Sequence, residues 1–270
     1  MTALAEEPAS LSWPVEGVAL ITLTKGETHN TLTTQLLACL GELIDRATAG
    51  KARVVVLTGS GKTFCGGAHI KLFTDPASAF YRNPRALRDE YVAPIIRVFS
   101  RLRDSSFVSV AAINGFALGG GCELALACDF RLMADTARIG LSEVRLGALA
   151  AAGGVQSLAH VVGRAKALEI ALLGDQWSAE DARAAGLVTA VHPADALPAA
   201  ALEFARRLLL CSPVSVAETK RALYRCATAG AEEADRIALD AVLAASAGDE
   251  WWEGMAAFAE RRQPSFRKGN

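Results

Sequence analysis

The order of apolar and polar positions predicts an alternation of strands and helices over about the first 150 residues. Short, almost wholly apolar runs are typical of strands buried on both faces, and apolar residues at three-and-four spacing indicate a helix with one buried face. Strands and helices that alternate at this spacing favour an α/β unit with right-handed crossovers. The predicted strands are 18–23, 54–58, 108–113 and 130–134, and the predicted helices are 33–49, a helix that ends near 102, and 122–128.

After about residue 155 the pattern becomes mostly helical. Glycine commonly ends a helix, and Gly163, Gly174 and Gly186 stand where three of these helices would stop. We therefore expect an α/β core over residues 1–200 and a helical C-terminal region over 201–270. The predicted helices are 155–162, 164–173, 178–185, 195–210, 213–227, 231–247 and 249–261, with one short strand at 187–191.

Two glycine-containing loops, 64–70 and 114–123, each follow a predicted strand. Glycine lets the backbone approach a ligand closely, so each loop can present a backbone N–H at the end of its strand. Two such donors that converge on one point form an oxyanion hole. The second loop also opens a helix, whose N-terminal dipole favours an anion. The alternative is that these glycines only allow tight packing between helix and strand.

Two glutamates follow the second loop. Glu123 lies in the first turn of an otherwise apolar helix, and Glu143 lies in the segment 140–147. Together they offer two carboxylates, of which one can act as a base while the other delivers a proton. The alternatives are that Glu123 satisfies N–H groups at the start of its own helix and that Glu143 is a surface carboxylate paired with Arg145.

Composition and charge narrow the classes of function. The formal net charge is -1, which does not suggest the strongly basic face of a nucleic-acid-binding protein. The six cysteines form no Cys-x-x-Cys pair and the four histidines are scattered, so we expect no metal site and a reducing compartment. The chain lacks a secretion-type start, a membrane span, and the motifs of nucleotide-binding loops and of the nucleophile elbow. We expect a soluble, cytoplasmic protein.

In combination, these motifs resemble the crotonase, or enoyl-CoA hydratase/isomerase, superfamily over roughly residues 15–268. The resemblance implies a spiral of β-β-α turns and a helical C-terminal region that drives formation of a homotrimer, often paired into a homohexamer. It also implies an acyl-CoA substrate, with coenzyme A as part of the substrate and no separate cofactor. The segments that carry the resemblance are Lys62–Lys71, Ala112–Asp129, Gly140–Gly147, Gly153–Gly154 and Glu253–Arg262.

The resemblance further implies roles for individual residues in hydration of a trans-2-enoyl-CoA to a 3-hydroxyacyl-CoA. The N–H groups of Ala68 and Gly120 would form the oxyanion hole for the thioester enolate. Glu123 would activate water toward C3, and Glu143 would exchange the proton at C2. The resemblance places Lys71 and the tail residues Arg267 and Lys268 near the coenzyme A phosphates. The residues that it places around the substrate are Gly67, Ala68, His69, Ile70, Lys71, Gly119 and Ala151.

Other reactions remain open at this point. Many Δ3,Δ2-enoyl-CoA isomerases keep only the second glutamate, so the pair Glu123 and Glu143 favours a hydratase. An isomerase, a crotonase-type hydrolase or decarboxylase, and a nucleic-acid-binding relative without catalysis are the alternatives. The chain departs from the family pattern at His29, at His69 and in the loop 150–152, where Ala-Ala-Ala replaces Pro-Gly-Ala. The acyl chain length and branching and the metabolic pathway do not follow from the sequence.

Overall fold

A six-stranded sheet lies at the centre of the computed structural model, which describes residues 7–266. The strand order is β1-β2-β3-β5-β7-β10, and every neighbouring pair except β1 with β2 is parallel. The four strands predicted from apolar runs are confirmed, while the edge strand β1, with mostly exposed residues, was not predicted. The strands are β1 (Ala9–Val15), β2 (Val18–Leu23), β3 (Val54–Gly59), β5 (Val108–Ile113), β7 (Phe130–Ala134) and β10 (Ala190–His192).

A second, smaller sheet has the order β4-β6-β8-β9. Its first three strands are parallel, and each comes directly after a strand of the large sheet in the chain. The chain therefore winds as a spiral of β-β-α turns, which confirms the expected fold class. None of the strands of the smaller sheet was predicted from the sequence. They are β4 (Thr63–Cys65), β6 (Phe116–Leu118), β8 (Arg138–Gly140) and β9 (Trp177–Ser178).

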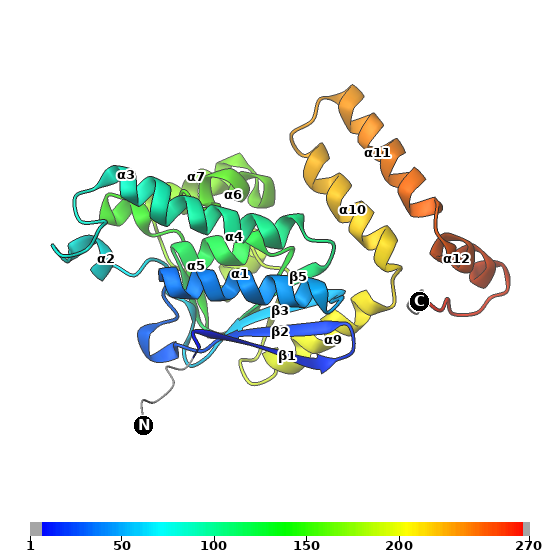
Figure 1. Ribbon diagram of the computed structural model, residues 1–270, viewed down its shortest axis with the longest axis horizontal. Coiled ribbons are helices and arrows are strands. Elements are labelled where there is room, and N and C mark those ends of the chain that lie inside the picture. The colour runs from blue at the N-terminus through cyan, green and yellow to red at the C-terminus, as the bar shows by residue number, and fades with distance from the viewer. Residues whose placement is uncertain (1–6, 267–270) are drawn as a thin grey trace.

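Helices cover both faces of the large sheet (Figure 1). Helix α1 (Thr34–Ala49) begins where the Thr33 side chain accepts a hydrogen bond from the Leu36 N–H at 3.1 Å, and its buried face is the apolar stripe seen in the sequence. The other helices are α2 (Lys71–Thr74), α3 (Pro84–Ala86), α4 (Ala93–Asp104), α5 (Gly120–Ala127), α6 (Gly154–Val162), α7 (Arg164–Leu173), α8 (Ala179–Ala184), α9 (Leu197–Leu209), α10 (Pro213–Cys226), α11 (Ala231–Ser246) and α12 (Asp249–Ala259).

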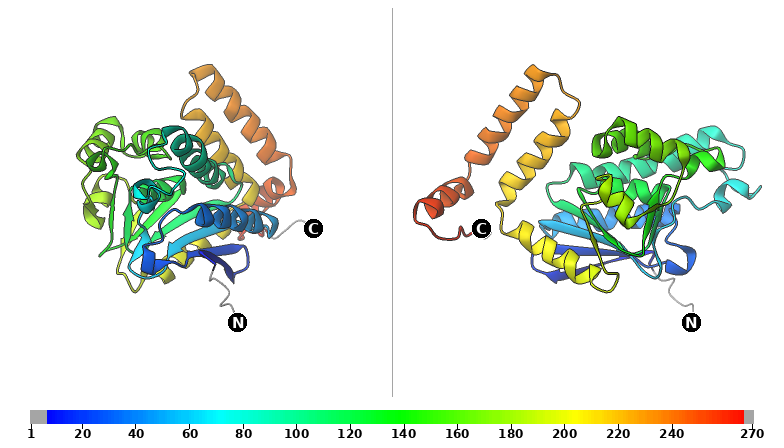
Figure 2. Two further views of the ribbon diagram at one scale, coloured as in Figure 1. Left: turned by 60° about the vertical axis from the view of Figure 1, so that its left-hand side comes forward. Right: turned by 180° about the vertical axis from the view of Figure 1, so that it is seen from behind.

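The last three helices extend away from the sheet, as Figures 1 and 2 show. A buried ion pair holds α10 to the body of the protein: Lys220 Nζ lies 2.8 Å from Asp129 Oδ2, and both side chains are about nine-tenths buried. Lys220 also donates to the carbonyls of Leu102 and Phe107. Helix α9 packs against β3, β5 and β7 and spans residue 200, so the division into 1–200 and 201–270 stays a prediction.

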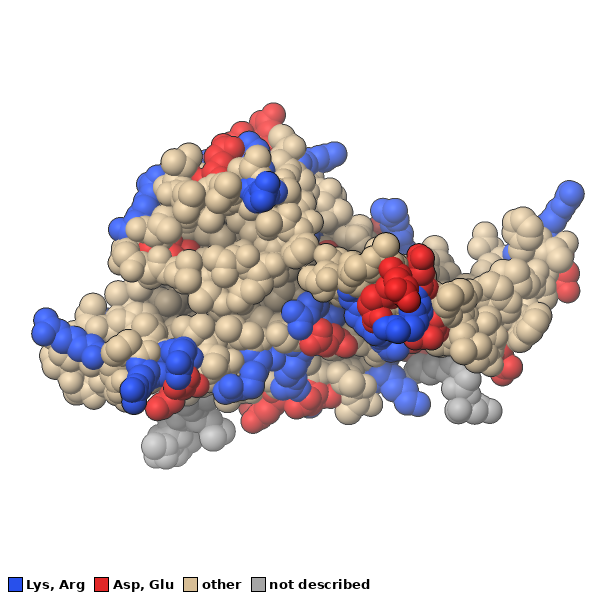
Figure 3. Space-filling model, turned by 90° about the horizontal axis from the view of Figure 1, so that it is seen from above, with Lys and Arg blue, Asp and Glu red and all other residues tan. Residues whose placement is uncertain are grey.

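The surface carries charges of both signs. On the face shown in Figure 3, blue and red side chains are interspersed, and no large area has a single sign. Within residues 7–266, no helix is both long enough and apolar enough to cross a membrane. The same residues contain no cluster of three or more His, Cys, Asp or Glu side chains that could hold a metal ion.

Candidate active site

The small sheet brings the two glycine-containing loops and Glu143 together. Strands β4, β6 and β8 are neighbours and parallel, so the segments that follow them start from the same edge of the sheet. A Cβ atom added to Gly67 would lie 2.9 Å from the Gly120 nitrogen, and one added to Gly120 would lie 3.8 Å from the Ala68 nitrogen. The two predicted oxyanion donors, Ala68 and Gly120, are therefore close neighbours, although 52 residues separate them in the chain.

Both of these backbone N–H groups lack a hydrogen-bond acceptor within residues 7–266. Gly120 is the first residue of α5, where an N–H group has no partner inside the helix. Gly119 before it has a φ of 54°, a conformation that side-chain-bearing residues rarely adopt. Two available donors side by side at the start of a helix are suited to bind the oxygen of a polarised carbonyl group.

The carboxylate of Glu123 is buried and held by a loop from elsewhere in the chain. Its Oε1 accepts hydrogen bonds from the N–H groups of Ala152 at 2.7 Å and Gly154 at 2.9 Å. Burial raises the pKa of Glu123 to about 7; the charge of Glu143 acts in the same direction, and the two N–H groups act against it. The alternative, in which Glu123 accepts from N–H groups of its own helix, is wrong, because both of its donors come from the loop 152–154.

Glu143 lies three residues beyond the end of β8 and against Gly119, the first of the three consecutive glycines in the second glycine loop. A Cβ atom on Gly119 would be 3.0 Å from Glu143 Oε1. The other carboxylate oxygen, Oε2, is buried and has no hydrogen-bond partner within the described part of the chain. Burial raises the pKa of Glu143, against a hydrogen bond from its own N–H. The alternative pairing with Arg145 is absent, because Arg145 binds Asp175 and the Leu173 carbonyl.

The residues after Ala68 lead away from this centre. His69 Nδ1 lies 3.0 Å from the hydroxyl of Thr31, which accounts for a polar residue at that point of the loop. Ile70 is half exposed, and Lys71 begins α2 as an exposed side chain. Lys71 is therefore available at the rim of the site, while the predicted contacts of Arg267 and Lys268 lie outside the described residues.

The loop 150–154 contacts Glu123 through Ala152 and Gly154, and the place of Ala151 beside the substrate stays a prediction. Ala151 donates its N–H to the Leu149 carbonyl at 2.9 Å, and its own carbonyl accepts from Gln156. The N–H that reaches the Glu123 carboxylate belongs to the next residue, Ala152. Ala151 thus lies beside the residue that positions Glu123, and it makes no hydrogen bond to either glutamate.

Asn30 is a supporting residue to which the sequence analysis assigned no role. Its side chain is fully buried and donates to the carbonyls of Thr63 at 2.8 Å and Phe64 at 3.2 Å, which holds β4 in place. Asn30 has a φ of 49°, in the left-handed region that asparagine tolerates better than most residues. The neighbouring His29 lies 3.3 Å from the Thr63 hydroxyl through Nδ1. No periodic pattern surrounds Asn30, so only the fold shows its role.

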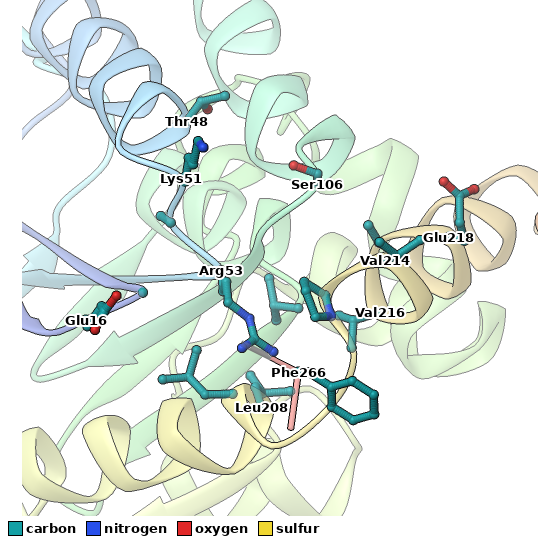
Figure 4. A pocket seen from close by; sticks show the side chains of 16 residues that line it. Glu16, Thr48, Lys51, Arg53, Ser106, Leu208, Val214, Val216, Glu218 and Phe266 are labelled. Carbon is teal, nitrogen blue, oxygen red and sulfur yellow. The ribbon is translucent and has the colours of Figure 1, made fainter. Parts of the chain in front are cut away.

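One cavity of the protein lies near the Glu123 loop, and another lies far from both glutamates. One, of about 580 Å³, lies between α4, α5, α6 and α10 and reaches Ala152 and Gly153, the loop that holds Glu123. The other, of about 850 Å³, lies at the amino ends of β3 and β5, away from both glutamates. Figure 4 shows the Arg53 side chain projecting into this second cavity near Leu208 and Phe266.

Comparisons with known proteins agree with this arrangement. The chain matches the profile of the family described as Enoyl-CoA hydratase/isomerase over residues 15–269. It is 34% identical to a probable enoyl-CoA hydratase of Mycobacterium bovis, over 92% of this chain and 94% of that protein. It is 33% identical to the 2,3-dehydroadipyl-CoA hydratase of Escherichia coli, over 93% of this chain and 95% of that protein.

Solved structures show the same similarity in three dimensions. The enoyl-CoA hydratase of Bacillus anthracis superimposes with a TM-score of 0.89 at 32% sequence identity. The superposition covers 96% of this chain and 98% of that one. The similarity therefore extends over the spiral and the C-terminal helices alike.

Proposed function

This chain belongs to the enoyl-CoA hydratase/isomerase family, and we propose from that premise that it adds water to a trans-2-enoyl-CoA to give a 3-hydroxyacyl-CoA. The observation that carries this reaction is the pair of carboxyl groups beside the unpaired N–H groups of Ala68 and Gly120: Glu123 is buried, and Glu143 is half-buried with its Oε2 atom enclosed. In this reaction coenzyme A is part of the substrate, and no separate cofactor takes part.

The oxyanion hole lowers the barrier by stabilising charge that develops during the reaction. The thioester oxygen accepts hydrogen bonds from Ala68 and Gly120. When water adds to C3, the electrons of the double bond move toward that oxygen and form an enolate. Donors that are already oriented stabilise this charge without further reorganisation, and loss of one such donor costs on the order of 10²–10³ in turnover in other enzymes.

The two carboxyl groups divide the proton transfers between them. Glu123, ionised, takes a proton from water as its oxygen bonds to C3. Two backbone N–H groups hold Glu123 Oε1, which leaves Oε2 to face the water. Glu143, protonated, gives its proton to C2 as the enolate collapses. The sum is one water added across the double bond, and a later exchange of one proton between the carboxyl groups and solvent restores the enzyme.

The raised pKa values favour one proton on this pair of carboxyl groups near neutral pH. A pair of neighbouring buried carboxyl groups holds one proton between them more readily than it holds two negative charges. The pKa of Glu123 is about 7 and that of Glu143 is also raised, so near neutral pH the pair retains a proton. One ionised and one protonated carboxyl group is the state that hydration requires.

For the acyl group we assign the cavity of about 580 Å³ that adjoins Ala152 and Gly153. Apolar side chains such as Ile96, Phe99 and Leu126 line it, together with Tyr224 and the charged residues Arg103, Asp104, Asp129, Arg131 and Arg225. Its volume lies within the usual range of small-molecule sites. One relative is named for the hydration of 2,3-dehydroadipyl-CoA.

We also propose that the chain assembles into a homotrimer, or a homohexamer made of two trimers. Two apolar surfaces support this, one around α7 and one on the projecting α11 and α12. If the second surface of each copy covers the first surface of the next, the contact is head-to-tail and can close into a ring. Exposed apolar side chains include Leu146, Leu149, Leu168, Leu172 and Leu173 on the first surface and Leu239, Leu243, Trp252 and Phe258 on the second. The six free cysteines are compatible with the cytoplasm as the proposed location.

Hydration of crotonyl-CoA tests the proposed function. We expect the wild-type protein to remove the absorbance of the enoyl thioester and to form a product heavier by one water. Glu123→Gln and Glu143→Gln should each lose at least about 10²-fold in kcat, as is usual when a general acid or base is removed. Glu42→Gln, at an exposed position on α1, is the matched control. Conversion of a 3-enoyl-CoA without uptake of water would instead identify an isomerase.

A further inference from the structure

Tyr91 is a buried tyrosine beside the candidate site to which neither the sequence nor the proposed reaction assigns a role. Its side chain is 3% exposed, and its hydroxyl donates to the Leu32 carbonyl at 2.7 Å. Tyr91 belongs to a π-helical turn, Leu87–Val92, immediately before α4. Such turns interrupt the regular spacing of a helix and occur frequently at functional sites.

Leu32, the partner of this hydroxyl, contacts both oxyanion loops. Its N–H donates to the Gly67 carbonyl at 2.8 Å, and Leu32 forms an isolated parallel bridge with Ala68. Its Cδ1 atom lies only 2.7 Å from where a Cβ atom on Gly120 would be. The position of Leu32 therefore determines how the first loop stands against the second.

The same hydroxyl also reaches the residue after Ala68. Burial is the main cause that raises the pKa of Tyr91, and a hydrogen bond from the His69 backbone acts against it. The phenol therefore stays neutral and can donate to Leu32 while it accepts from His69. These two backbone groups lie on either side of the bridge between Leu32 and Ala68.

We propose that Tyr91 is a positioning residue for the oxyanion hole: through Leu32 and the His69 backbone, its hydroxyl sets the Ala68 N–H at the distance from Gly120 that a single oxygen atom needs. The proposal rests on the proposed function only for the identity of the reaction. Tyr91 itself touches neither glutamate through a hydrogen bond within residues 7–266. Its effect is therefore on the binding of the thioester oxygen, separately from proton transfer.

An aromatic cluster, formed by Phe73, Phe80 and Tyr91, connects this hydroxyl to the segment 71–92. The Tyr91 ring packs edge-to-face against Phe73 at 5.2 Å and against Phe80 at 5.6 Å between ring centroids. Phe73 and Phe80 also meet each other, at 6.5 Å. Edge-to-face pairs of this kind stabilise one relative orientation of the rings. The cluster holds Tyr91 in place, so the contribution of the hydroxyl can be tested while the ring is kept.

Tyr91→Phe is the variant that separates the two contributions. It keeps the ring contacts and removes the hydroxyl that donates to the Leu32 carbonyl. We expect kcat for crotonyl-CoA to fall about tenfold or more, which is less than the effect of removing a donor outright. We expect KM to stay within about twofold. Tyr81→Phe is the control, because Tyr81 lies in the same segment and its hydroxyl makes no hydrogen bond within residues 7–266.

A spectroscopic measurement tests the oxyanion hole directly. Bound butyryl-CoA is a saturated thioester that cannot be hydrated, and hydrogen bonds to its carbonyl lower the C=O stretching frequency. We expect that lowering in the wild type and Tyr81→Phe, and a smaller one in Tyr91→Phe. Leu32→Val, which removes the Cδ1 atom that contacts Gly120, should have the same effect and serves if Tyr91→Phe does not fold.

Each result bears on one claim. A wild-type kcat together with a wild-type carbonyl frequency in both Tyr91→Phe and Leu32→Val would overturn the positioning role. Failure of the wild-type protein to hydrate trans-2-enoyl-CoA thioesters of any chain length, from crotonyl-CoA upward, would contradict the proposed function instead. In that case the carbonyl frequency of bound butyryl-CoA still decides whether Tyr91 positions the two N–H groups.

Discussion

Gly119 and Glu143 lie so close together that a side chain at residue 119 would push on the carboxylate: a Cβ atom there would be 3.0 Å from Glu143 Oε1. The backbone of Gly119 also has a φ of 54°, which residues with a Cβ atom rarely adopt. The contact places one candidate acid beside the N–H of the following residue, Gly120. A single glycine therefore joins the oxyanion loop to the carboxyl group.

Gly119→Ala should displace the Glu143 carboxylate and reduce hydration of crotonyl-CoA by about 10²-fold or more, since proton transfer depends on the position of that group. The measurement is kcat by loss of the enoyl absorbance. Gly147→Ala is the control. Gly147 also has a positive φ, 72°, but no atom lies within 4 Å of its added Cβ atom. Equal losses in the two variants would mean that backbone strain, and not the contact with Glu143, causes the effect.

The pH dependence of kcat/KM should report the raised pKa of Glu123. Because Glu123 acts in its ionised form, we expect kcat/KM to fall below about pH 7, approaching tenfold for each pH unit. The charge of Glu143 helps to raise this pKa, so Glu143→Gln should move the acid limb of its residual activity to lower pH. A profile of the wild type that is flat between about pH 5 and 8 would contradict this assignment.

The same pKa has a consequence for stability. The folded state binds the Glu123 proton more tightly than the unfolded state, whose pKa is near 4.5. The resulting stabilisation is fully present below that value and is lost as the pH rises through about 7. We expect the unfolding free energy of the wild type, relative to Glu123→Gln, to fall by roughly 3 kcal/mol over this range. Denaturant titrations at several pH values measure the difference.

Lys220→Met should destabilise the attachment of α10, because it leaves the Asp129 carboxylate buried without its cation. Breaking a buried ion pair by removing one partner costs about 3–5 kcal/mol in other proteins. Lys166→Met is the matched control: its ion pair with Glu169 is exposed and within one helix, so we expect less than about 1 kcal/mol. Thermal unfolding and denaturant titration measure both. Equal effects would contradict the anchoring role of Lys220.

The double variant Lys220→Met with Asp129→Asn separates the charge from the packing. If the lost ion pair causes the destabilisation, removing both charges should restore part of the stability that Lys220→Met alone loses. Tyr224 donates to the same carboxylate at 3.0 Å and can still donate to an asparagine oxygen. No recovery in the double variant would assign the effect to lost packing of α10.

Local patterns in the sequence were enough to predict most strands of the large sheet and most helices. Apolar runs such as 54–58 and 108–113 can be recognised locally, because a strand buried on both faces needs an apolar residue at every position. The helix ends at Gly163 and Gly174 could also be predicted from single residues, because glycine readily takes the positive φ that both positions have. The two glycine loops and the two glutamates of the candidate site could also be picked out in the sequence, and the family resemblance gave them roles.

The sequence did not show how the two glycine loops and the two glutamates come together, because that depends on the tertiary structure. Strands β4, β6 and β8 have three residues each, too few to show a period, yet their pairing brings Ala68, Gly120 and Glu143 together. The amides that hold Glu123 come from 29 and 31 residues away, and the contact of Tyr91 with Leu32 spans 59. Local patterns record which face of an element is buried, whereas contacts between distant segments depend on the sheet order and loop paths that the whole chain adopts.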